Sequence, residues 1–190
     1  MKKSILVISV LVLVFACAPV QKQADEAQVS KLQKLLDTPG KSLQQEVYLV
    51  DKLPATNYTI RVEAIVVNDV ITNEKATAVK LSTYSTVGSA LTTHTGLLDE
   101  DEIEPVIKLL EHLRDTTLKS KPDTDSNIRF HSRSGIHIGA NYDARLSSWL
   151  IYFNTKGEEQ TARSVLRENN KIDEAISVFR DALETFKTAI

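Results

Sequence analysis

The stretch Tyr-Thr-Ile-Arg-Val-Glu-Ala-Ile-Val-Val at residues 58–67 decides the fold class, because its side chains alternate between apolar and polar. The apolar set on one face would be Tyr58, Ile60, Val62, Ala64 and Val66, and the opposite face would carry Arg61 and Glu63. Alternation with a period of two is typical of a strand with one buried face. Such strands form antiparallel sheets covered on one side, whereas parallel strands are apolar on both faces.

Further strands and two helices are expected after this one. Strands are predicted at 77–84, more weakly at 90–94, as a hairpin at 128–132 and 136–142, and at 148–154 and 161–166. Residues 42–53 fit either a strand or a helix end. Apolar residues at helical spacing run from Ile103 to Thr117 and from Ile172 to Ile190. The sequence therefore predicts an α+β fold, an antiparallel sheet of about five to seven strands with two amphipathic helices packed on one face.

An acidic run precedes the first of these helices. Asp99 to Glu102 would lie where the helix dipole is positive, and Pro105 fits the first turn, which predicts a helix start at about residues 101–104. A calcium loop is the alternative, but the run lacks the glycine and the ligand spacing of such loops.

The two helical patterns are also related by a shift of 69 residues. That shift places Thr86-Val87-Gly88 on Thr155-Lys156-Gly157, and Ile103 and Ile107 on Ile172 and Ile176. It suggests two meander-plus-helix repeats. Chance similarity between amphipathic helices is the competing explanation.

The N-terminus predicts export. Met1-Lys2-Lys3 is basic and Ser4 to Ala16 is apolar, and this segment is too short to span a bilayer, which needs about 20 residues. Residues 1–16 are therefore expected to be a signal peptide. Val14-Phe15-Ala16-Cys17 resembles the bacterial lipobox, whose cysteine becomes the lipidated first residue of the mature protein.

The resemblance implies lipid attachment at Cys17, with acyl chains such as palmitate that anchor the protein to a membrane. Residue 18 is alanine and not aspartate, so the resemblance favours the outer membrane or, more widely, the cell envelope. Ordinary secretion or release into the periplasm, with cleavage after Ala18, is the alternative. Cys17 is the only cysteine, so it has no disulfide partner within the chain.

The remaining chain divides into a tether and a domain. Residues 17–41 are expected to be a lipid-anchored tether with one short helix, whose stripe is Val29, Leu32, Leu35 and Leu36. Residues 42–190 would form a single globular domain. Without the signal peptide, 21 basic residues face 25 acidic ones, because two of the 23 lie in it, a net charge of about −4. No block of like charge favours a nucleic-acid partner.

One hairpin provides the candidate binding face. A three-residue loop ending at Gly135 would pair Phe130 with Ile138 and His131 with His137. The candidate residues of this face are Arg129, His131, Arg133 and His137. Two imidazoles are too few for a zinc site and the arginines would repel a cation, so no metal is expected. A solvated polar face is the plain interpretation, and a small anion or an acidic partner the functional one.

No catalytic motif is visible. The serines lie outside any nucleophile elbow or triad context, and no glycine-rich phosphate loop occurs. We therefore expect no enzyme and no cofactor. The favoured function is a lipid-anchored, non-enzymatic binding or assembly module with an envelope protein as partner. The alternatives are a carrier with an apolar pocket between sheet and helices, and an envelope hydrolase.

Overall fold

The computed structural model describes residues 29–56, 59–87, 90–156, 163–166 and 168–189. The predicted signal peptide, Cys17 and residues 18–28 lie outside this part. The fold is α+β, with two antiparallel four-stranded sheets. The elements are α1 (Lys31–Leu36), β1 (Leu43–Pro54), β2 (Thr59–Asp69), β3 (Lys75–Val87), β4 (Ala90–Asp99), α2 (Glu100–Asp115), the 3₁₀ turn Thr117–Lys119, β5 (Ser126–His131), β6 (His137–Asp143), β7 (Ser148–Asn154), β8 (Arg163–Val165), the 3₁₀ turn Asn169–Lys171 and α3 (Ile172–Thr188).

A single sheet was predicted, but the strands form two sheets. Strands β1 to β4 form one meander and β5 to β8 a second, in sequence order. Helix α2 follows β4 directly, so the chain leaves the first sheet before β5 begins. Each sheet is followed by one long helix, an order that agrees with the expected pair of meander-plus-helix units.

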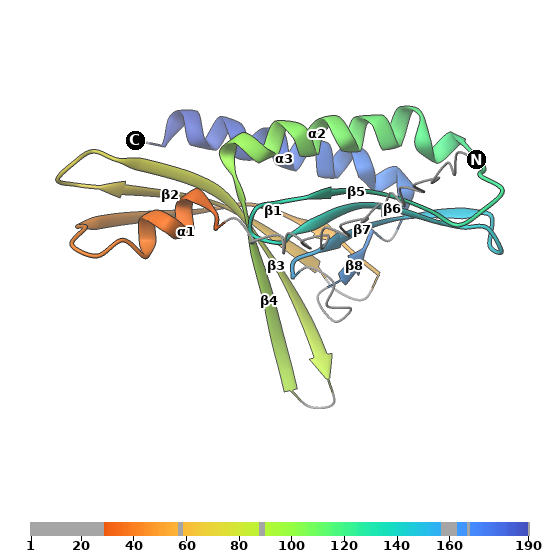
Figure 1. Ribbon diagram of the computed structural model, residues 1–190, viewed down its shortest axis with the longest axis horizontal. Helices are drawn as coiled ribbons and strands as arrows, with labels where there is room; N and C mark the ends of the chain where they lie inside the picture. Colours follow the sequence, from red (N-terminus) through yellow and green to blue (C-terminus); the bar gives the residue numbers. More distant parts are fainter. Residues whose placement is uncertain (1–28, 57–58, 88–89, 157–162, 167, 190) are drawn as a thin grey trace, which may run out of the picture.

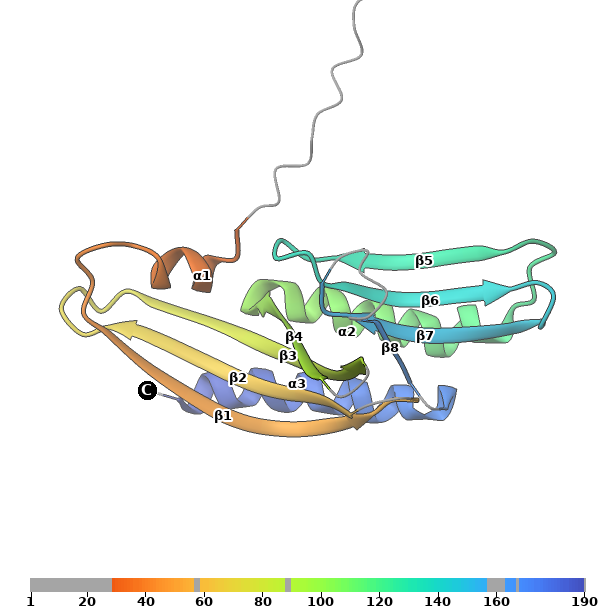
Figure 2. The ribbon, with the colours of Figure 1, turned by 90° about the horizontal axis from the view of Figure 1, so that it is seen from below.

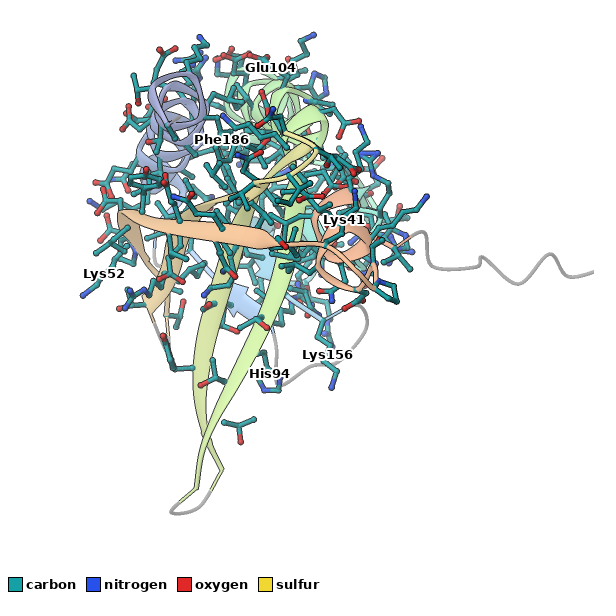
Figure 3. All side chains as sticks on the ribbon, turned by 90° about the vertical axis from the view of Figure 1, so that its left-hand side faces the viewer. Lys41, Lys52, His94, Glu104, Lys156 and Phe186 are labelled. Carbon is teal, nitrogen blue, oxygen red and sulfur yellow. The ribbon has the colours of Figure 1, made fainter. Side chains whose placement is uncertain are left out.

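The two long helices lie together on one side of both sheets (Figure 1). Helix α3 contacts β1 and β2 of the first sheet, whereas α2 contacts β3, β4 and β6. Phe186 on α3 points into the layer between helices and sheets, and Glu104 on α2 points away from it (Figure 3). This layer is the main core, and Ile107, Phe153 and Phe179 are among its buried members.

Several contacts join the two sheets. An isolated bridge pairs Ala55 with Leu166, next to a hydrogen bond from the Thr56 N–H to the Val165 carbonyl at 2.8 Å. Gly96 on β4 lies against Ile136, so closely that a Cβ there would come within 2.5 Å of the isoleucine side chain. The glycine is required for this close approach of β4 to the second sheet.

Strand β2 is apolar on both faces, which the alternating pattern did not predict. Ile60, Val62, Ala64 and Val66 face the main core as expected, and all are buried. Ile65 and Val67 lie on the opposite side, which we call the outer face, where Leu32 and Leu35 of α1 cover them. Figure 1 shows α1 below the first sheet, with α2 and α3 above it. Helix α1, which was expected within the tether, therefore packs on the outer face of the first sheet.

The predicted start of the first long helix needs a small correction. Helix α2 begins at Glu100, so Pro105 is its sixth residue and lies beyond the first turn. The predicted first turn was wrong because Glu102 bonds back to the Asp99 N–H at 3.0 Å and stabilises an earlier start. The second long helix, α3, begins at Ile172 as its apolar pattern predicts, directly after the 3₁₀ turn Asn169–Lys171.

The turn between β2 and β3 is built around Asp69. Its carboxylate accepts hydrogen bonds from the Thr72 hydroxyl at 2.7 Å and the Ile71 N–H at 3.0 Å, and it pairs with Lys41 at 3.1 Å. These donors hold the pKa of Asp69 well below its usual range, the Thr72 hydroxyl most strongly. Asn73 adopts a φ of 57°, a left-handed conformation that asparagine tolerates.

Candidate functional site

The predicted hairpin register is confirmed. His131 lies directly across the ladder from His137, and Phe130 across from Ile138. Gly135 has a φ of 86°, as the three-residue loop requires, and the Ser132 N–H bonds the Ile136 carbonyl at 2.9 Å. The two imidazole rings stand edge to face with centroids 4.3 Å apart.

The four residues of the predicted binding face do not come together in one site. Arg129 and His131 are exposed on β5, an outer strand of the second sheet, whereas His137 is buried on β6. Arg133 turns away from the histidines toward the start of α2. There its Nε lies 3.2 Å from Asp99 Oδ2, and its guanidinium also pairs with Asp101. Within the described chain, no group of three or more metal-ligating side chains is assembled.

A groove on the outer face of the first sheet is the more developed site. Its volume is about 540 Å³, within the range of ligand-binding clefts. We call it the α1 groove, and it is lined by Val29, Ser30, Leu32, Gln33, Leu36, Gln45, Ile65, Lys80, Thr95, Gly96, Leu97, Arg133 and Ser134. One wall is thus α1 and its N-terminal flank, the floor is the outer face of the sheet, and the far end is the β5–β6 loop.

One buried carboxylate holds α1 at this position. Asp99, the residue before α2, accepts hydrogen bonds from the Ser30 hydroxyl at 2.7 Å and from the Lys31 N–H at 2.9 Å. It therefore supplies a negative charge to the N-terminus of a helix far away in the sequence, where free N–H groups need an acceptor. Arg133 contacts the same carboxylate from the β5–β6 loop, so three segments meet at Asp99.

Both cations of the groove are already paired. Lys80 Nζ lies 2.7 Å from Glu63 Oε2, and Arg61 contacts the same carboxylate at 2.8 Å. Burial alone would raise the pKa of Glu63, but Lys80 and Arg61 hold it below its usual value. Arg133 is occupied by Asp99 and Asp101. Among the described residues of its lining, the groove therefore has no unpaired cation to select an anionic ligand.

The described side chains of the groove include few acid–base groups. None of the described residues that line it has a carboxylate, imidazole or thiol group. The Ser134 hydroxyl bonds the backbone of Leu97, accepting from its N–H at 3.2 Å, so it serves to join the β5–β6 loop to β4. A serine nucleophile would need a neighbouring base, and the described lining offers neither an imidazole nor a carboxylate for that role.

Sequence reasoning missed this site, although two signals pointed to it. Leu32 and Leu35 form an apolar stripe that needs a partner, and residues 64–67 are apolar without interruption. Together they indicate a strand with a second buried face and a helix that can cover it.

None of the described helices is long and apolar enough to cross a membrane.

Comparisons with known proteins do not extend the assignment of the groove. No family model matches the chain, and neither the curated proteins nor the solved structures give a match.

Proposed function

We propose that this chain is a lipid-anchored, non-enzymatic binding module of the cell envelope, and that its α1 groove receives an apolar segment of a partner protein. The observation that supports this most directly is the groove itself. Its lining includes the accessible apolar side chains of Val29, Leu36 and Leu97, and its two cations, Lys80 and Arg133, are paired with carboxylates.

A peptide is favoured over a free acyl chain by the polar rim. The Gln45 amide is exposed at the groove, where it offers both donors and an acceptor to a peptide backbone. An acyl chain has no use for such groups. The carrier alternative placed an apolar pocket between sheet and helices, but fully buried side chains such as Phe153 and Phe179 pack that layer.

The anchor would keep the groove close to the membrane. Cys17 and Val29 are 12 positions apart (29 minus 17). An extended chain spans at most about 3.6 Å per residue, so a lipid on Cys17 would hold the groove wall within about 43 Å of the bilayer. The expected partner is therefore a membrane-proximal segment of an envelope protein.

Membrane attachment and groove binding are tested separately. Cys17→Ser should move the protein from the membrane fraction to the soluble fraction, and unchanged fractionation would contradict lipid anchoring. For the groove, a photo-crosslinking amino acid is placed at Gln33 in living cells. The same amino acid at Lys108, exposed on α2, is the control.

One defined protein adduct at Gln33, absent at Lys108, is the expected result. It should disappear when Thr95→Trp fills the groove, and persist with Thr92→Trp, an exposed position of the same strand outside it. A lipid adduct alone would instead support a carrier. No adduct specific to Gln33, or one insensitive to Thr95→Trp, would contradict a groove that binds protein.

A further inference from the structure

Strand β1 has an open edge. It is the outermost strand of the first sheet, as Figure 2 shows along the lower margin. Its pairing with β2 is regular from Leu43 to Leu49, and a bulge follows between Leu49 and Asp51. Among the described residues, no backbone hydrogen bond from another element reaches the outer side of Leu43 to Leu49.

The register identifies the unused backbone groups. The Val70 N–H donates to the Ser42 carbonyl at 2.9 Å, so these residues form a hydrogen-bonded pair. Such pairs recur at every second residue of an antiparallel ladder. The backbones of Glu46 and Tyr48 therefore bond β2, whereas those of Gln45, Val47 and Leu49 point away from the sheet.

Between Leu43 and Leu49 this edge has little of the usual protection against pairing, because Glu46 is its one charged side chain and the bulge, Lys52 and Pro54 all lie beyond Leu49. Natural edge strands are commonly shielded by lysine, proline or bulges. Between Leu43 and Leu49 there is no proline, lysine or bulge, and the Val47 and Leu49 side chains are 47% and 53% exposed. By contrast, the outer strand β5 carries exposed Arg129 and His131.

We propose that β1 pairs antiparallel with β1 of a second copy of this chain, about a two-fold axis at Val47. This register places Val47 opposite itself, Gln45 opposite Leu49, and Glu46 opposite Tyr48. A phenol facing a carboxylate is a favourable pair, and the same two side chains already hydrogen-bond within one chain. A register centred on Glu46 would instead oppose two carboxylates, which is destabilising.

The pairing is also compatible with one membrane. A two-fold axis perpendicular to the joined sheet leaves both outer faces on one side and both pairs of long helices on the other. Both chains then enter α1 from the same side, so two anchored copies could associate on one bilayer. The dimer does not depend on what fills the groove, so either proposal can fail alone.

The decisive experiment is disulfide trapping of the full chain in bacterial cell envelopes. Hydrogen-bonded antiparallel pairs have Cα atoms about 5.5 Å apart, within disulfide reach. Val47→Cys should therefore give a covalent dimer under mild oxidation. Val70→Cys, which is equally exposed at 50% but lies in the β2–β3 turn, should not.

Two further arms test the register and the association. Gln45→Cys and Leu49→Cys should not crosslink alone, but should crosslink to each other when co-expressed. In detergent solution, Val47→Lys should halve the sedimenting protein mass, because the pairing would place the two introduced lysines opposite each other. Val70→Lys should leave the sedimenting mass unchanged. The proposal is overturned if Val47→Cys crosslinks no faster than Val70→Cys, or if the unmodified chain sediments as a monomer at tens of micromolar.

Discussion

Replacing Asp99 with alanine tests whether one buried carboxylate holds α1, and with it the groove, on the domain. Asp99 is 1% exposed and accepts hydrogen bonds from Ser30 and Lys31. Loss of a helix-capping side chain costs about 1 kcal/mol. Buried donors left without an acceptor cost about 1–3 kcal/mol more. Arg133 keeps Asp101, so no unpaired charge is added. We expect Asp99→Ala to lower the free energy of unfolding by about 3 kcal/mol.

The measurement is urea unfolding followed by fluorescence of Trp149, which is the only tryptophan and is buried. Hydrogen exchange at Lys31–Leu36 is measured in parallel, and α1 should lose protection before the sheets do. Asp99→Asn keeps an acceptor without the charge and should cost about half as much. Asp101→Ala removes a half-exposed partner of the same arginine and should cost less than about 1 kcal/mol. A loss below about 1 kcal/mol for Asp99→Ala, or unchanged protection of α1, would refute the role given to Asp99.

Three further predictions concern the core, the hairpin and the pH dependence of stability. Ile107→Asp and Ile176→Asp each bury an unpaired charge beneath a long helix, so calorimetry should show melting temperatures lower by about 10 °C. An unchanged melting temperature would mean that this face of the helix does not pack against the core. Gly135→Val should cost about 1–2 kcal/mol in urea unfolding, because its φ of 86° is unfavourable for a side chain although the surrounding space is open; a neutral effect would contradict the loop conformation. Asp69 has a lowered pKa in the folded protein, so its stabilisation is complete above about pH 4 and is lost as the pH falls through the folded value. The stability difference between wild type and Asp69→Asn should therefore shrink in acid, and a gap that stays constant from pH 7 to pH 2 would exclude this linkage.

The hairpin shows how much of the structure the local sequence pattern alone can predict. His131 faces His137 because an apolar pair beside them must share one face and because Gly135 permits the turn. Both constraints lie within a short stretch of sequence. The strand at residues 148–154 was predicted with the bounds that the structure shows for the same reason, since the apolar Trp149, Ile151 and Phe153 occupy every second position.

The candidate site could not be predicted in this way, because its parts come from distant segments. Arg133 was assigned to the histidine face, but its guanidinium pairs with Asp101 and Asp99, carboxylates 32 and 34 positions earlier in the chain (133 minus 101 and 133 minus 99). No periodicity links these residues. Their contact exists only because β4 passes the β5–β6 loop at Gly96.

The sequence by itself determined the α+β class, the antiparallel pairing of each hairpin and the two amphipathic helices, since each depends on neighbours within one or two turns or strands. The tertiary structure alone decided that the strands divide into two sheets, that α1 covers the outer face of β2, and that a groove remains beside it. The physical reason is that an apolar stripe shows only that a surface must be buried. Which surface covers it depends on the free energy of the whole packed chain.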